Sequence, residues 1–213
     1  MNNLIAVTIG DIKGIGIEIL LKTWQSKKIK NFILFTNEKY FLYYLKKNNI
    51  KIKYKVINNI SIKLLNLYKN KFLIYTYNAI NNPDNTYKSL KYAYEFTKLK
   101  KSIGIITLPL NKNIIIKNID KKFQGQTEFF QKLDNKKYSN MIFIHQKIII
   151  ATLTNHIRLK SVTNEIKKTE KILNKIRILN NTLIFKFNLK KPKLIISGIN
   201  PHCSEEGNFG NEE

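Results

Sequence analysis

The segment Thr8-Ile9-Gly10-Asp11-Ile12-Lys13-Gly14-Ile15-Gly16-Ile17-Glu18 joins a short apolar run to a longer amphipathic stretch. Residues 4–9 have the length and composition of a buried strand, and residues 15–25 have the spacing of a helix. A glycine-rich turn between a strand and a helix allows a ligand to approach the backbone closely. Its spacing, Gly-x-x-x-Gly-x-Gly, matches neither the dinucleotide fingerprint nor the Walker phosphate loop. The pattern therefore leaves two readings open, a structural turn and a loop that lines a binding site.

The same alternation of apolar runs and amphipathic stretches continues along the chain and predicts an α/β fold. Further strands are expected at residues 31–35, 52–57, 72–75, 103–107 and 193–196, helices at 38–47, 86–100, 128–133 and 162–179, and a hairpin at 141–144 and 147–153. Residues 78–85 form the most loop-like stretch, which is too short to separate domains. We therefore expect residues 1–213 to form a single α/β unit without independent, linker-separated domains.

The composition is that of a strongly basic globular protein. The sequence has 38 Lys and Arg against 14 Asp and Glu, a net charge of +24, and 43% of its residues are hydrophobic, which excludes wholesale disorder. A charge this large attracts nucleic acid. The only arginines, however, are Arg158 and Arg177. Because base and phosphate recognition depends heavily on the arginine fork, the sequence disfavours nucleic-acid binding, and it remains a third-choice hypothesis.

The sequence also predicts where the protein resides. Its apolar runs are far shorter than the roughly 20 residues of a membrane-spanning helix, and no basic leader or cleavage site is visible at its start. The single cysteine, Cys203, cannot form an intrachain disulfide. We expect a cytoplasmic protein that makes no contact with a membrane.

Other segments also suggest ligand binding. Gly125-Gln126-Thr127-Glu128 precedes an apolar helix, where Thr127 could act as a cap and free amides could hold an anion. His156 and His202 each follow a predicted strand, and the carboxyl ends of strands are where open α/β sheets bind ligands. The two imidazoles could share a metal. From the residues alone, an ordinary helix cap and two unrelated loop histidines stay open as alternatives, and His145 in the hairpin turn is expected to be a bystander.

These segments, taken in order, resemble one family, 4-hydroxythreonine-4-phosphate dehydrogenase of pyridoxal phosphate biosynthesis. Residues 8–18 are similar to its Thr-Pro-Gly-Asp-Pro-Ala-Gly-Ile-Gly-Pro-Glu segment. The later counterparts are Pro109-Leu110-Asn111-Lys112 for Pro-x-Asn-Lys, residues 125–128 for Gly-His-Thr-Glu, Thr154-Asn155-His156 for Thr-Thr-His, and residues 198–207 for Gly-Leu-Asn-Pro-His-Ala-Gly-Glu-Gly-Gly. Five matches in the same order make the resemblance specific.

The resemblance implies a fold and a set of site residues. The fold would be the three-layer α/β/α type of the isocitrate and isopropylmalate dehydrogenases. His156 and His202 would be ligands of a divalent metal, which could be zinc, magnesium or cobalt. Gln126 and Thr127 would contact the substrate, a small phosphorylated amino acid. Gln126 stands in the place of a family histidine; its amide can donate a hydrogen bond but cannot carry a positive charge.

The resemblance also implies an activity, NAD- or NADP-dependent oxidative decarboxylation of 4-phosphooxy-L-threonine to 3-amino-2-oxopropyl phosphate. Family members continue past the equivalent of Glu213 into a Tyr-His-Asp-Gln segment that supplies the third metal ligand, so we expect a C-terminally incomplete fold whose activity needs the restored part. The family implies a homodimer, and a complementing chain is another way to supply that part. The alternative is a non-catalytic remnant or dimerising fragment of the same family.

Overall fold

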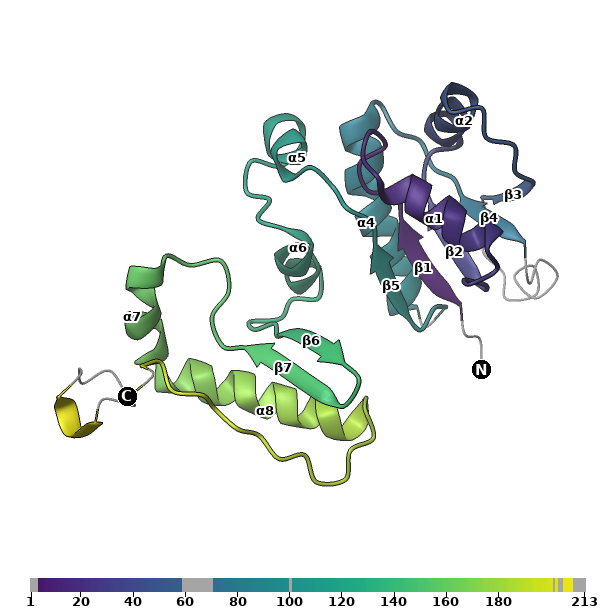
Figure 1. Cartoon of the computed structure of the whole chain (residues 1–213). Helices are drawn as coiled ribbons and strands as arrows, with labels where there is room; N and C mark the ends of the chain where they lie inside the picture. Colours follow the sequence, from purple (N-terminus) through teal and green to yellow (C-terminus); the bar gives the residue numbers. More distant parts are fainter. Residues whose placement is uncertain (1–3, 59–70, 100, 201, 203–204, 209–213) are drawn as a thin grey trace. The chain divides into compact units, whose positions relative to one another are not determined.

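Five short strands form one parallel sheet in the computed structural model, which describes residues 4–58, 71–99, 101–200, 202 and 205–208. The strands are β1 (Ile5–Thr8), β2 (Phe32–Phe35), β3 (Tyr54–Ile57), β4 (Phe72–Tyr75) and β5 (Gly104–Thr107). They lie in the order β3-β4-β2-β1-β5, and each neighbouring pair is parallel. Most of these strands are continuous apolar runs, as expected for a parallel sheet covered on both faces. The predicted α/β fold is confirmed (Figure 1).

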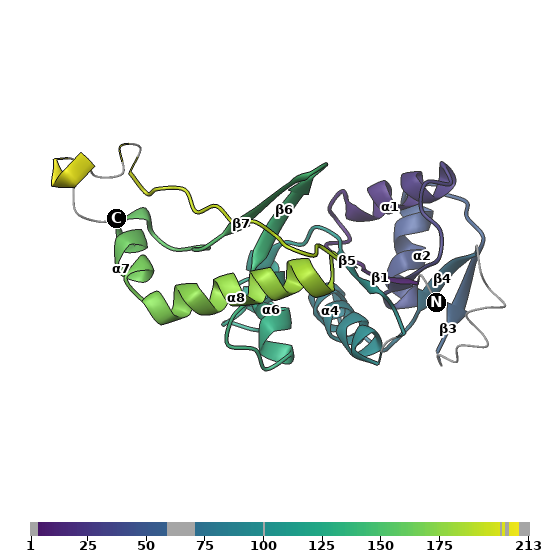
Figure 2. The same cartoon turned by 90° about the horizontal axis from the view of Figure 1, so that it is seen from below.

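Helices cover both faces of this sheet (Figures 1 and 2). In β1, Val7 packs in one core with Leu20 of α1 (Gly16–Gln25) and Phe41 of α2 (Glu38–Lys47). The preceding residue, Ala6, points to the opposite face and packs in a second core with Phe96 of α4 (Asn82–Lys98). Successive side chains of a strand point to opposite faces, so one apolar strand supplies both cores.

Helix α4 begins earlier than the sequence pattern predicts. Its first residue is Asn82, so the second half of the expected loop at 78–85 is helical. The Asn81 side chain caps this helix by accepting a hydrogen bond of 2.9 Å from the Asp84 amide, and Pro83 lies in the first turn. Proline at this position needs no amide hydrogen bond, and its fixed φ suits a helix start. Pro83 lies within the stretch expected to be a loop, and it is part of a helix start.

The chain divides into two compact units, Met1–Phe130 and Gln131–Glu213. The first contains the parallel sheet and α5 (Lys112–Asn118), which the sequence analysis did not predict; α6 (Gln126–Leu133) extends across the division. This division is one of compactness and does not show whether the two units are independent domains. The expectation of a single unit therefore stays a prediction. In the described part of the chain, no helix combines the length and apolarity that a membrane span requires.

The second unit contains the predicted hairpin. Strands β6 (Met141–His145) and β7 (Ile148–Thr152) are antiparallel, with Met141 opposite Thr152 and His145 opposite Ile148. The turn residue Gln146 has a φ of 51°. The hairpin prediction is confirmed.

The prediction of one continuous helix at residues 162–179 is wrong, because two helices occupy this segment. A 3-10 turn (η1, Leu159–Ser161) leads into α7 (Val162–Ile166), and α8 (Thr169–Phe185) starts only after a break. Lys168 leaves the helical conformation with a ψ of 69°. The Glu165 carboxylate closes this corner by accepting hydrogen bonds from Lys168 and Lys171. Apolar spacing cannot reveal such a corner, because the apolar residues keep a helical period on both sides of it.

The strand expected at residues 193–196 is also wrong. Residues 192–198 adopt no regular structure, and the Ile195 side chain is 94% exposed. A strand requires a hydrogen-bonded neighbour, and no described strand pairs with this segment. The short 3-10 turn η2 (Glu205–Gly207) is the last described element.

Candidate functional site

The order of the strands makes the edge between β1 and β5 the candidate ligand-binding position. The chain leaves β1 through α1 toward β2 on one side, and it returns through α4 to β5 on the other side. Open α/β sheets bind ligands at such a switch point, outside the carboxyl ends of the strands. The glycine-rich turn after β1 and the Pro109–Lys112 segment after β5 both start at this edge. Two of the sequence-predicted segments are therefore neighbours in space.

These two loops are in direct contact. The Asp11 amide donates a hydrogen bond of 2.8 Å to the Pro109 carbonyl oxygen. Gly10 has a φ of +65°, and a Cβ atom on it would lie 2.4 Å from the same oxygen. A Cβ atom on Gly16 would lie 3.0 Å from Leu108 Cβ. The glycines therefore have a structural reason, the close approach of the two loops, which does not depend on a ligand.

Helix α4, which covers the face of the sheet opposite to α1, forms hydrogen bonds with the glycine-rich turn. The Thr86 hydroxyl donates to the Gly10 carbonyl at 2.7 Å. The Ser89 hydroxyl accepts from the Ile9 amide at 2.9 Å and donates to the Phe35 carbonyl at 2.8 Å. Both hydroxyl-bearing residues are buried. The turn is thus a fixed part of the sheet edge.

A third segment, Gly125–Glu128, lies against the second loop. A Cβ atom on Gly125 would lie 3.1 Å from Lys112 Nζ and 2.9 Å from Glu128 Oε2. The Gln126 side-chain amide donates to the Leu108 carbonyl at 3.3 Å. Helix α6 begins at Gln126, so Thr127 lies inside its first turn and is not at the cap position that the sequence suggested. An ammonium group beside the start of a helix is a favourable environment for a phosphate.

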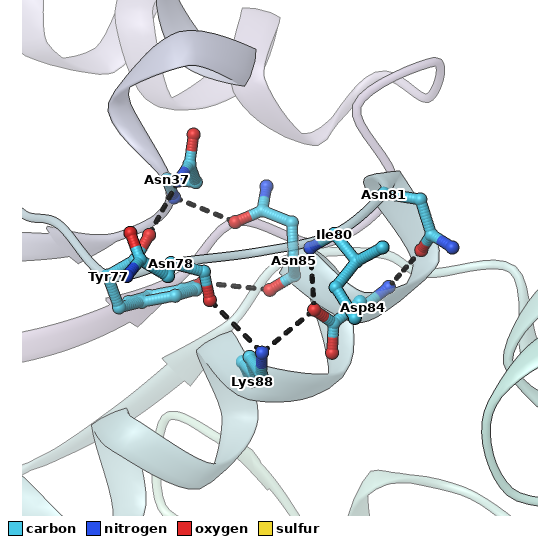
Figure 3. A network of polar contacts seen from close by, with 8 residues as sticks. All are labelled: Asn37, Tyr77, Asn78, Ile80, Asn81, Asp84, Asn85 and Lys88. Carbon is cyan, nitrogen blue, oxygen red and sulfur yellow. Dashed lines mark hydrogen bonds and ion pairs between the residues drawn. The ribbon is translucent and has the colours of Figure 1, made fainter.

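A polar network, in which Asn37, Tyr77, Asp84 and Asn85 are buried, supports the neighbouring strand ends (Figure 3). Asn85 accepts from the Asn37 amide at 2.7 Å through its side chain and from the Tyr77 hydroxyl at 2.8 Å through its backbone. Lys88 pairs with Asp84 at 2.9 Å and donates to the Asn78 carbonyl at 3.1 Å. The network ties the start of α4 to the segments that follow β2 and β4. It is one reason why α4 can hold the glycine-rich turn.

Replacing Asn85 by alanine is expected to lower the free energy of unfolding by about 2–3 kcal/mol. The change leaves the buried Asn37 amide without its acceptor and removes the Asn85 hydrogen bond to the Thr36 hydroxyl. Urea denaturation followed by circular dichroism measures the effect. The matched control is Asn48→Ala, which removes an exposed asparagine at the end of α2. Equal losses in both variants would contradict a special role for the network.

The two predicted metal ligands belong to the second unit, and each lies on the surface. His156 follows β7 and has a φ of +55°. His202 Nδ1 lies 2.8 Å from Glu205 Oε1, and its amide donates to Asn200 Oδ1 at 2.9 Å. A carboxylate on one ring nitrogen is the arrangement that accompanies metal-ligating imidazoles, so His202 fits this role. His145 is exposed at the end of β6.

The described residues contain no group of three or more His, Cys, Asp or Glu side chains placed to hold a metal. Cys203 lies outside the described residues. That His156 and His202 share a metal stays a prediction. Sequence reasoning missed one group near the His156 segment, the Lys175 ammonium. Its only sequence signal is a lysine within the apolar spacing of α8.

Comparisons with known proteins agree on one family. The family described as "Pyridoxal phosphate biosynthetic protein PdxA" matches residues 24–213. The 4-hydroxythreonine-4-phosphate dehydrogenase of Sulfurihydrogenibium sp. (strain YO3AOP1) is 32% identical over 217 residues, which cover 98% of this chain and 66% of the relative. That of Aquifex aeolicus (strain VF5) is 33% identical over 225 residues, covering 100% of this chain and 68% of the relative. The chain thus spans about two thirds of the length of these relatives.

A solved structure has the same fold. The crystal structure of 4-hydroxythreonine-4-phosphate dehydrogenase from Klebsiella pneumoniae superposes with a TM-score of 0.83 at 21% sequence identity, covering 99% of this chain and 68% of that chain. At this identity the likeness concerns the fold alone. It bears out the expected three-layer α/β/α architecture of the isocitrate dehydrogenase type.

Proposed function

Because the chain belongs to the family of pyridoxal phosphate biosynthetic protein PdxA, a family of oxidoreductases, we propose that it oxidises and decarboxylates 4-phosphooxy-L-threonine. The products would be 3-amino-2-oxopropyl phosphate and carbon dioxide, with NAD or NADP as the hydride acceptor. The substrate is a small phosphorylated amino acid, and the site must therefore hold a phosphate dianion.

The observation that carries this proposal is the grouping of three family-like segments at the switch point between β1 and β5. Lys112 Nζ lies beside Gly125 at the start of α6, where its charge and the helix amides favour an anion, while the nearby Glu128 carboxylate opposes one. Thr127, in the first turn of α6, would contact the substrate through its hydroxyl. Gln126 would donate a hydrogen bond from its side-chain amide. Since Gln126 also donates to the Leu108 carbonyl, substrate would compete with that bond.

The chain offers two residues for the divalent metal, His156 and His202. When bound, the cation supplies Lewis acidity toward the keto oxygen of the oxidised substrate, and the nicotinamide takes up hydride. His202 would be oriented by Glu205, whose carboxylate lies at Nδ1. Zinc, magnesium and cobalt remain the candidate ions. Because a catalytic zinc site normally has three protein ligands, a further ligand from outside the described residues is part of the proposal.

We also propose that the protein works in the cytoplasm as a homodimer or with a complementing chain. A single cysteine in the sequence suits a reducing compartment.

In the hairpin, the apolar side chains of Phe143, Ile144, Ile148 and Ile150 are exposed, which favours contact with another polypeptide. Light scattering of the purified chain measures its mass directly.

The test of the proposed function is a turnover assay. Purified chain is mixed with 4-phosphooxy-L-threonine, a divalent metal and NAD or NADP, and the absorbance of the reduced nicotinamide is followed. Thr127→Val should lower kcat/KM by about tenfold or more, because one hydrogen bond to a charged group is lost. Thr23→Val, on the exposed side of α1, is the matched control. Turnover that is equal in both variants would contradict the role of Thr127.

A second candidate, a non-catalytic remnant or dimerising fragment of the same family, is favoured by one observation. Gln126 stands where the family has a histidine, and an amide cannot move a proton or carry charge. Calorimetric titration separates the two candidates. Substrate binding without nicotinamide reduction, under conditions in which a full-length relative is active, would support the non-catalytic one.

A further inference from the structure

One buried charge in the second unit has no part in the proposed chemistry. Lys175, in the middle of α8, is only 7% exposed although lysine side chains are rarely buried. Its Nζ donates to the Leu153 carbonyl at 2.5 Å and to the Thr152 carbonyl at 3.4 Å. Both carbonyls lie at the carboxyl end of β7, immediately before Thr154-Asn155-His156.

The same turn of α8 also binds the neighbouring strand. The Asn140 side-chain amide donates to the Lys175 carbonyl at 2.9 Å. Since Met141 is opposite Thr152 in the ladder, Asn140 and Leu153 both lie just beyond the last pair. Lys175 therefore holds the two strands at one point, where the ladder no longer supplies hydrogen bonds.

Burial of the Lys175 ammonium group is unfavourable, and the neighbouring charges modify this penalty. Burial lowers the pKa of Lys175, the nearby Lys171 lowers it further, and Glu165 opposes both. The two lysines Lys168 and Lys171 hold the pKa of Glu165 at about 2. A buried cation is unfavourable unless its donors are satisfied, and an apolar side chain would pack here without that cost. The carbonyl oxygens of Thr152 and Leu153 accept hydrogen bonds from this ammonium group and satisfy two of its three donors.

The segment that Lys175 restrains has a defined conformation. The Thr152 hydroxyl and the Asn155 side chain share a hydrogen bond, and His156 adopts a positive φ of 55°. A non-glycine residue keeps such a φ only when its surroundings hold it. The direction of the imidazole thus depends on how the chain leaves β7.

We propose that Lys175 is a positioning residue that fixes the carbonyls of Thr152 and Leu153. It thereby sets the direction in which the chain leaves β7 and the orientation of His156. The restraint is a property of the second unit alone. Its use, alignment of a metal-ligating imidazole, rests on the proposed function.

The test compares Lys175→Met, which keeps the length of the side chain without its donors, with Lys175→Arg, which restores donors. Arg177→Met is the matched control, because it removes an exposed cation two residues along the same helix. Hydrogen exchange of the amides at residues 153–157 is measured by mass spectrometry without metal. Cobalt binding to each variant is then followed by its visible absorption spectrum.

Lys175→Met should exchange at residues 153–157 about tenfold faster or more, since a hydrogen bond to a charged group is lost. Its cobalt affinity should fall by about 10- to 100-fold, as for other losses of support to a metal ligand. Lys175→Arg should recover most of both, and Arg177→Met should match the parent protein. Exchange in β6 serves as the internal measure of global stability.

The outcomes separate this inference from the proposed function. Unchanged exchange at residues 153–157 in Lys175→Met overturns the positioning role, whatever the metal data show. Faster exchange there, together with no cobalt binding in the parent protein, keeps the restraint and contradicts the metal site. If exchange in Lys175→Met is also faster throughout β6, and Lys175→Arg does not restore it, Lys175 is merely structural. That outcome would also overturn the inference.

Discussion

Replacing Gly10 by alanine should destabilise the protein by about 3 kcal/mol or more. The φ of +65° costs roughly 1–2 kcal/mol for a residue with a Cβ atom. The new methyl group would lie 2.4 Å from the Pro109 carbonyl oxygen, and overpacking of this kind costs about 1–3 kcal/mol more. Backbone is on both sides of the clash, so no side chain can simply rotate away.

The matched control for this change is Gly104→Ala. A Cβ atom on Gly104, in β5, meets no other atom within 4 Å. Its effect should stay within about 0.5 kcal/mol. Urea denaturation of both variants measures the difference, and the Asp11 amide reports by hydrogen exchange whether its bond to Pro109 is lost. Equal midpoints would mean that the two loops do not meet as described.

Removing either predicted metal ligand should have the largest effect on activity. His156→Ala and His202→Ala should each weaken binding of a divalent cation by about 100-fold or more, because even the loss of a residue that only supports a ligand costs 10- to 100-fold. Turnover at limiting metal should fall by the same factor. If both imidazoles ligate one ion, the double variant should be little worse than either single variant.

His145→Ala is the control for these two changes, since it removes an exposed histidine at the hairpin turn of the same unit. Metal affinity and turnover should be those of the parent protein. Calorimetric titration with zinc, magnesium and cobalt compares the parent protein, the two single variants, the double variant and His145→Ala under one condition. A parent-like affinity in His156→Ala or in His202→Ala would remove that residue from the site.

The strands of the parallel sheet could be predicted from sequence because most of them are short apolar runs between polar turns. Helix α5 could not be predicted in this way, because its one sequence signal is the capping residue Asn111. The Asn111 side chain accepts hydrogen bonds from the Asn113 and Ile114 amides. The break between α7 and α8 depends on contacts of Glu165 with two lysines, which lie outside any apolar period. Propensity and period describe one element at a time, whereas caps and corners depend on specific partners.

In the candidate site, too, the sequence predicts the individual segments but not which of them are in contact. The sequence picked out Gly10, Gly125 and Thr127 as parts of separate turns, and the order of the strands brings their loops to one edge. That order could not be obtained from spacing. Lys175 was missed for a related reason, because a lysine on an amphipathic helix is normally solvated. In the part of the chain that the structure describes, its acceptors are the carbonyl oxygens of Thr152 and Leu153 at the end of β7.

The position of β1 between β2 and β5 also has a consequence for how the chain acquires its structure during synthesis. One neighbour, β2, emerges from the ribosome soon after β1, but the other, β5, follows only after β2, β3, β4 and α4 have been made. Contacts that are distant in sequence form slowly, because a long stretch of chain must first be ordered. The glycine-rich turn rests on the loop after β5 and therefore cannot settle before it. Nascent chains halted ahead of β5 should remain susceptible to protease at this turn, and those halted beyond it should become resistant.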